Sequence, residues 1–158
     1  MSFAWLSPEE THSVLRYLEE RFGIPAGVLE GHRLFRRGGY VWAVRPEAAD
    51  LCGELRVAGG GLRLVREMGP GRYKPATRGI QAFGGRACRN VLDVQDGQLR
   101  ALIQGQALPA PEGMRGFILV RWKGQVLGVA LVRNGQIQGQ FPRALTEHLR
   151  LGPGEWVL

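Results

Sequence analysis

The chain has 158 residues, of which 44% are hydrophobic and 22% charged, the composition of a globular protein. Its 21 Lys and Arg residues outnumber 14 Asp and Glu residues, so the formal net charge is +7 at pH 7 and an anionic partner is expected. No apolar run reaches the roughly 18–20 residues that span a membrane, and the N-terminus lacks the regions of a signal peptide. We therefore expect a cytoplasmic protein that does not enter a membrane.

The first elements predict a small α/β module. Ser7 followed three residues later by Glu10 forms the pattern of a helix start with a capping box, and Gly23 indicates the helix end. Apolar residues between them recur at helical spacing. Two strands then flank the glycines at 38–39, a two-residue hairpin signature. Residues 46–52 predict one further helical turn.

The remaining chain predicts short strands separated by short helices and glycine turns. The clearest hairpin signal is Asn134-Gly135. The predicted strands cover 62–66, 91–94, 116–122, 126–133, 136–141 and 156–158. The predicted helices are 76–83, one capped by Asp96 and one opened by Pro142, whereas 71–75 is predicted as a loop. This order indicates an α+β protein: a small α/β module over 1–52, then a partly closed β-barrel with short helices over 53–158.

Residues suited to catalysis or metal binding are sparse. Cys52 and Cys88 form no CxxC motif and have no histidine at metal-ligand spacing, so both are predicted to be buried small apolar residues in a reducing cytosol. The glycine run at 59–61 lacks the Lys-Ser/Thr of a P-loop and is interpreted as a strand connection. No GxGxxG, GxSxG or HExxH pattern occurs. The residues therefore predict no enzyme, no catalytic group, no cofactor and no metal.

Basic residues gather in four segments. The first, 33–37, we interpret as a solvated face. The second, 71–78, surrounds Tyr73 with cations where a loop enters a helix, an arrangement that holds phosphate oxygens. The third is 86–89, and the fourth is the hairpin of 121–133 with its continuation. The predicted RNA-binding residues are Arg72, Tyr73, Lys74, Arg78, Arg121, Lys123, Arg133 and Arg143.

These residues have expected roles. Tyr73 is predicted to stack on a base, and the cations near it and Arg143 to hold phosphates. Strand alternation places Arg121 and Lys123 on one face and turns Trp122 into the core. All but two of the 21 basic residues are arginine, whose planar fork suits phosphates and base edges. A GC-rich genome predicts the same bias, so both explanations stay open.

The C-terminal half carries a family resemblance. The stretch RGFILVRWKGQVLG at 115–128, Asn134-Gly135 and FPRAL at 141–145 resemble the PUA-like RNA-binding domain at the C-terminus of RsmF-type rRNA cytosine methyltransferases. Four further segments resemble the same domain or the small domain before it, namely 22–25, 40–42, 61–64 and 72–75. The resemblance covers nearly the whole chain and implies a pre-PUA module over 1–52 and a PUA-like barrel over 53–158.

The chain also departs from that family. Leu131 stands where a lysine is usual, and Gln138-Gly139 stand where Lys-Asn is usual, so two expected RNA contacts are replaced. The glycine loop that binds SAM and the catalytic Pro-Cys or Thr-Cys motif do not occur. The chain thus resembles the targeting end of such an enzyme, and its Met1 and helix cap suggest a free-standing protein. The same pairing of domains is similar to a non-catalytic ribosome-assembly factor of archaea and eukaryotes.

Three functions follow as hypotheses. The first is a non-catalytic RNA-binding protein that recognises structured rRNA in ribosome assembly or rRNA modification, with rRNA or a ribosomal precursor as partner. The second is an accessory subunit, or detached C-terminal part, that supports a methyltransferase in trans. The third is a protein-interaction module whose positive charge only maintains solubility.

Overall fold

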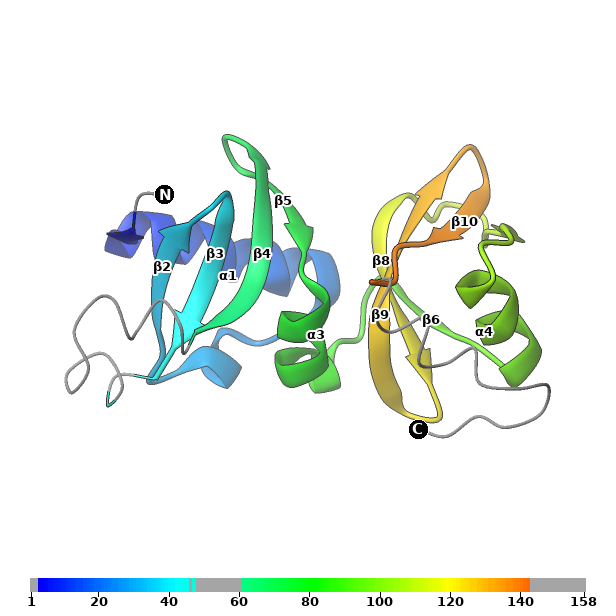
Figure 1. Cartoon of the computed structure of the whole chain (residues 1–158), viewed down its shortest axis with the longest axis horizontal. Helices are drawn as coiled ribbons and strands as arrows, with labels where there is room; N and C mark the ends of the chain where they lie inside the picture. The colour runs from blue at the N-terminus through cyan, green and yellow to red at the C-terminus, as the bar shows by residue number, and fades with distance from the viewer. Residues whose placement is uncertain (1–2, 46, 48–60, 143–158) are drawn as a thin grey trace. The chain divides into compact units, whose positions relative to one another are not determined.

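The computed structural model describes residues 3–45, 47 and 61–142 (Figure 1). Several predictions made from the sequence therefore lie outside the described residues. They are the helical turn within 46–52, the helix beyond Pro142, the strand at 156–158, Cys52 and Arg143.

The chain divides into two compact units, Met1–Arg89 and Asn90–Leu158. The predicted boundary at 52/53 lies outside the described residues. The observed division comes later because the strand that begins at Leu62 pairs with the strand that ends at Val44, so both belong to one sheet.

The first unit holds a five-stranded antiparallel sheet in the order β1-β2-β3-β4-β5. Its strands are β1 (Ala4–Trp5), β2 (Arg33–Arg37), β3 (Tyr40–Val44), β4 (Leu62–Gly69) and β5 (Arg72–Pro75). Its helices are α1 (Pro8–Phe22), the 3-10 helix η1 (Ala26–Leu29), α3 (Thr77–Phe83) and the 3-10 helix η2 (Gly84–Arg86). The loop predicted at 71–75 was wrong: the turn through Gly69 and Gly71, with φ of 147° and 67°, returns the chain along β4 as a strand.

Helix α1 begins and ends where the sequence predicts. The Ser7 hydroxyl accepts from the Glu10 amide at 3.1 Å, and the Glu10 carboxylate accepts from the Ser7 amide at 2.8 Å. Gly23 closes the helix in the left-handed region at φ 71°. The helix runs across one face of the sheet (Figure 1). Its buried residues are Val14, Leu18 and Phe22.

The second unit holds a curled five-stranded sheet in the order β6-β8-β9-β10-β7, in which only β6 and β8 are parallel (Figure 1). Its strands are β6 (Val91–Asp93), β7 (Leu108–Pro109), β8 (Gly116–Trp122), β9 (Gln125–Arg133) and β10 (Gln136–Gly139). Helix α4 (Asp96–Ile103) adds Leu99, Leu102 and Ile103 to the core. The predicted α+β class is confirmed, and left-handed residues at 123–124 and 134–135 form the predicted hairpin turns.

Two local predictions were wrong. Asp96 is the first residue of α4 rather than its cap; Gln95 caps the helix and completes a capping box with Gln98. Cys88 is exposed rather than buried. Its amide donates to the Phe22 carbonyl at 2.8 Å, which holds its backbone at the end of α1 while the side chain reaches solvent.

Candidate nucleic-acid interface

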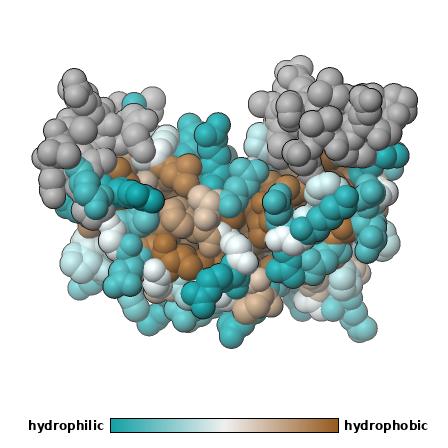
Figure 2. Space-filling view, turned by 90° about the horizontal axis from the view of Figure 1, so that it is seen from below, coloured by the Kyte–Doolittle hydropathy of each residue, from teal (hydrophilic) through white to brown (hydrophobic). Residues whose placement is uncertain are grey.

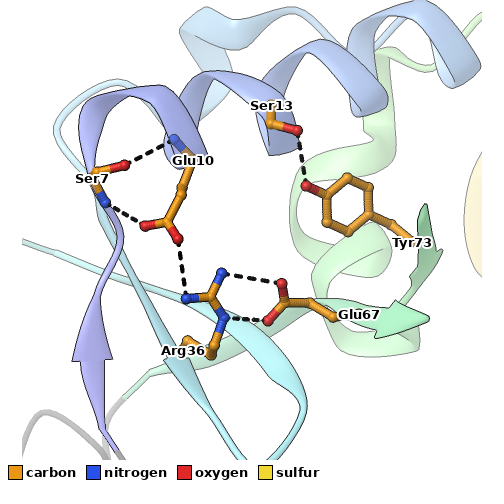
Figure 3. A network of polar contacts seen from close by, with 6 residues as sticks. All are labelled: Ser7, Glu10, Ser13, Arg36, Glu67 and Tyr73. Atoms are coloured by element: carbon orange, nitrogen blue, oxygen red, sulfur yellow. Dashed lines mark hydrogen bonds and ion pairs between the residues drawn. The ribbon is translucent and has the colours of Figure 1, made fainter. Parts of the chain in front are cut away.

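On the α1 side of the first sheet, polar contacts engage Arg36, which belongs to the first basic segment of the sequence, 33–37. The Arg36 guanidinium donates to both carboxylate oxygens of Glu67 on β4 and, at 3.3 Å, to Glu10 on α1 (Figure 3). Hydrogen bonding to Glu67 raises the pKa of Arg36, and the Ser7 amide lowers the pKa of Glu10. Arg36 therefore ties two strands to the helix, whereas Arg33 and Arg37 alternate to the opposite face.

Tyr73 belongs to the same side of the sheet. Its hydroxyl lies 2.9 Å from the hydroxyl of Ser13 (Figure 3). Its ring centre lies 5.2 Å from that of Tyr17. Both partners are on α1. The structure therefore favours a role for Tyr73 in joining β5 to the helix over the predicted role of an open stacking plane.

Of the other predicted residues of this segment, Arg72 and Arg78 are exposed and Lys74 is half-buried. Lys74 pairs across the sheet with Arg66, which places both on the face away from α1. Arg72 is exposed beside the β4–β5 turn, and Arg78 is exposed in the first turn of α3. The strand β5 thus sends Tyr73 to one face and its two cations to the other.

In the second unit, Arg121 is paired with a carboxylate. Its guanidinium donates to both oxygens of Asp93 on β6, at 2.6 and 2.9 Å, and this hydrogen bonding lowers the pKa of Asp93. Trp122 is buried, as predicted, and its indole N–H donates to Asp96 at 2.7 Å. An anion can engage Arg121 only by competing with Asp93.

Lys123 and Arg133 are exposed at opposite ends of the nine-residue strand β9. The Lys123 ammonium lies 4.5 Å from the centre of the Trp122 ring, in the β8–β9 turn. Arg133 ends β9 at the turn into β10. The structure therefore does not bring these two predicted residues into one cluster.

The face of the first sheet away from α1 carries residues that the predicted site did not include. We call it the aromatic–cationic face and define it by Trp5, Arg33, Tyr40, Trp42, Arg63 and Arg66. The Arg33 guanidinium lies 3.8 Å from the centre of the Trp5 ring. The Arg63 guanidinium lies 4.5 and 5.1 Å from the ring centres of Tyr40 and Trp42. The hairpin turn at 38–39 indicates that Arg33, Tyr40 and Trp42 share a face, but no local signal places Arg63 with them.

An apolar pocket of about 760 Å³ opens in the first unit between η1, the end of β3 and α3. Val28, Val44 and Phe83 line it, with Arg45 and Arg86 at its polar positions. Apolar residues gather within hydrophilic surroundings in Figure 2, which shows the molecule from below. The His32 ring meets Phe83 edge to face, and its Nδ1 is buried without a hydrogen-bond partner among the described residues.

Two further properties hold for the described part of the chain. No group of three or more His, Cys, Asp or Glu residues there is arranged to hold a metal ion. None of the helices described is both long and apolar enough to cross a membrane.

Residues 89–146 match the model of the methyltransferase RsmF PUA domain family. The match begins at the boundary between the two compact units and covers the whole of the β8–β9–β10 arrangement.

Longer similarity extends to proteins named ribosomal RNA small subunit methyltransferase F. The chain is 26% identical to that of Aeromonas salmonicida over 145 residues and 26% identical to that of Aeromonas hydrophila over 144. It is 23% identical to that of Psychromonas ingrahamii over 150 residues. Each comparison covers 90% of this chain but only 29% to 31% of the relative. The resemblance predicted from the sequence is confirmed, and the chain spans less than a third of the curated relatives it matches.

Proposed function

We propose that this chain binds structured ribosomal RNA, without catalysing a reaction, in ribosome assembly or rRNA modification. The observation that carries the proposal is the match of the second unit to the RsmF PUA domain, together with exposed cations at both ends of β9. The relatives are named for an rRNA methyltransferase activity, and the net charge of +7 favours a polyanionic partner.

The proposed contacts are phosphate contacts, which position an RNA without reading its bases. Arginine and lysine side chains that reach solvent are suited to them, and each unit contributes some, all of them exposed except the half-buried Lys74. The residues proposed are Arg72, Lys74, Arg78, Lys123 and Arg133, with Arg143 proposed from the sequence alone. Arg121 contributes less, because Asp93 already occupies its guanidinium.

Binding of rRNA fragments, measured by fluorescence anisotropy over a series of salt concentrations, tests the proposal. We expect affinity to fall steeply with salt, with a slope of roughly 0.7 to 0.9 per neutralised phosphate. The variant Lys123→Ala/Arg133→Ala should reduce this slope by about one to two units, whereas Arg100→Ala, an exposed change on α4, should leave it almost unchanged. Absence of binding at low salt would overturn the proposal.

A second candidate function is support of a methyltransferase in trans. The observation that favours it is the coverage of the relatives, because similarity extends over nearly all of this chain and under a third of theirs. Affinity purification from cells should then recover a catalytic partner, and deletion should reduce rRNA cytosine methylation. Unchanged methylation with no partner recovered argues against this candidate.

The third candidate function, a protein-interaction module, is supported only if rRNA fragments do not bind. In that outcome the cations serve solubility alone, and substituting them changes neither complex formation nor the recovered partners.

A further inference from the structure

We propose that the aromatic–cationic face of the first unit binds unpaired RNA nucleotides by stacking their bases on its rings and arginine planes. This inference rests on the proposed function and names the class of RNA that the first unit takes. It concerns the first unit alone, and it adds base stacking to the phosphate contacts proposed for Arg72, Lys74 and Arg78.

The pairing of strands places these side chains in two adjacent rows. One row runs Trp5, Phe35, Trp42 and Arg63 across β1 to β4, and the next runs Arg37, Tyr40, Arg66 and Lys74 across β2 to β5. Directly opposed residues on neighbouring strands lie about 5 Å apart on the same face. The two rows therefore form a continuous surface.

One irregularity is needed to complete the first row. Val41 pairs with Val65, but Trp42 pairs with Arg63, so Leu64 is an extra residue in β4. Simple alternation places Arg63 on the same side as Val65, toward α1. The bulge turns Arg63 to the other face, where its guanidinium meets the rings of Tyr40 and Trp42.

The rings of the first row are held rigidly. Phe35 is fully buried and stacks on Trp42 with the ring centres 5.9 Å apart and an angle of 10° between planes. The Trp42 indole N–H donates to the Arg37 carbonyl at 3.1 Å. Trp5, Tyr40 and Trp42 are themselves partly exposed, and Arg33, Arg63 and Arg66 are exposed. A rigid platform loses little side-chain entropy when a base stacks on it.

Charge is separated between the two faces of the sheet. Within β1 to β5 the one carboxylate is Glu67, and it lies on the α1 side with Arg36. The arginines at 33, 63 and 66 thus meet no carboxylate from these strands on their own face. A polyanion is therefore favoured there over a neutral partner.

The geometry favours unpaired RNA over a duplex or an acidic peptide. An A-form duplex hides its base faces and offers phosphates and shape, for which scattered cations suffice. An acidic peptide carries charge but no planar rings to match the two rows. Unpaired nucleotides present both features, since every base has a face that stacks on an aromatic ring or a guanidinium.

Binding of three probes to the full chain tests the inference. The probes are an oligouridylate of about 12 nucleotides, within the usual site size of single-strand binders, an abasic backbone of equal length, and an RNA duplex. Anisotropy measures affinity, and tryptophan fluorescence reports stacking. We expect the oligouridylate to bind roughly tenfold more tightly than the abasic backbone, and to quench tryptophan fluorescence where the abasic backbone does not.

The variants separate stacking from charge. Arg63→Ala should weaken oligouridylate binding about tenfold. Arg16→Ala removes an equal charge from the solvent-facing side of α1 and should change this binding less than about twofold. Arg63→Lys keeps the charge but lacks the plane, so it should stay impaired for the oligouridylate and bind the abasic backbone like the wild type. Thermal melting verifies that these surface variants fold.

The outcomes distinguish the inference from the proposed function. Equal affinity for oligouridylate and abasic backbone, with rRNA fragments still bound, overturns the inference and leaves the proposed function intact. The inference is also overturned if Arg63→Ala weakens oligouridylate binding no more than Arg16→Ala does. Displacement of the oligouridylate by poly-glutamate of equal charge assigns the face to acidic peptides and also overturns the inference. If no RNA of any kind binds, both proposals fail together.

Discussion

Gly79 lies directly against the backbone of Leu64. A Cβ atom at Gly79 would be 2.8 Å from the Leu64 Cα and 2.6 Å from the Arg63 carbonyl oxygen, so only glycine fits between α3 and β4. Leu64 is the extra residue of the bulge, and its carbonyl accepts from the Ala76 amide at 3.0 Å. Helix α3 therefore packs on the irregularity that presents Arg63 to the opposite face.

The substitution Gly79→Ala should destabilise the protein by about 1–3 kcal/mol, because backbone atoms cannot move away as the end of a side chain can. It should also weaken oligouridylate binding, since the bulge that orients Arg63 must shift. Chemical denaturation measures the first effect and anisotropy the second. Gly85→Ala, in the adjacent η2, has nothing within 4 Å of the new Cβ and should be nearly neutral. Equal stability of the two variants contradicts this account.

The bond between Tyr73 and Ser13 should be measurable as a coupling energy. Tyr73→Phe and Ser13→Ala should each cost about 0.5–1.5 kcal/mol of unfolding free energy, and the double variant should cost less than their sum. A double-mutant cycle in urea gives the coupling. Tyr73→Phe keeps the ring and should leave RNA affinity unchanged, because the ring packs on α1. A specific loss of RNA affinity would instead assign the Tyr73 hydroxyl, rather than Ser13, to an RNA contact.

Stability should depend on pH through Asp93. The bonds from Arg121 lower its pKa in the folded protein below the ordinary value of 3.8. The unfolded chain therefore takes up this proton first as pH falls. The stabilisation is complete above the ordinary carboxyl pKa and is lost as pH falls through the lowered one. Unfolding free energy measured from about pH 7 to about pH 2.5 should show this loss. In Asp93→Asn the unfolding free energy should fall less steeply over the same range, because the titrating carboxyl group is absent.

Tyr17 gives a complementary effect in alkali. Burial raises its pKa from 10.0 to about 12. The unfolded chain then loses this proton before the folded one, so the stabilisation is present below pH 10 and is lost between 10 and about 12. Ultraviolet titration of tyrosinate should show one late-titrating group, which Tyr17→Phe removes. A full titration of all tyrosines near their ordinary pKa would contradict the observed burial.

Arg121 and Lys123 should differ in their effect on RNA binding although each carries one positive charge. Lys123→Ala removes an exposed cation and should weaken binding of rRNA fragments more than Arg121→Ala, whose guanidinium Asp93 already holds. Asp93→Asn should strengthen binding, since it removes a competing anion. Anisotropy at one fixed low salt concentration compares the three. The reverse order of the two cation variants contradicts the assigned roles.

Local patterns were sufficient for much of the fold. The Ser7–Glu10 capping box, the Gly23 helix end and the turn at Asn134-Gly135 follow from interactions within a few residues, and the structure has all three. β5 was missed because a four-residue strand acquires its identity only from its partner β4. Cys88 was misplaced because exposure depends on what the rest of the chain covers.

The candidate site shows the same division. The order of the residues was enough to identify the cations and the resemblance of the C-terminal half to a PUA-like domain, since composition and motif are properties of the linear chain. The folded arrangement was needed to show that the side chains of Arg36, Tyr73 and Arg121 are bonded to other side chains. It was also needed to place Arg63 against Tyr40 and Trp42. The physical reason is that these contacts join residues distant in the sequence, and one extra residue at Leu64 reverses the face that alternation assigns to Arg63.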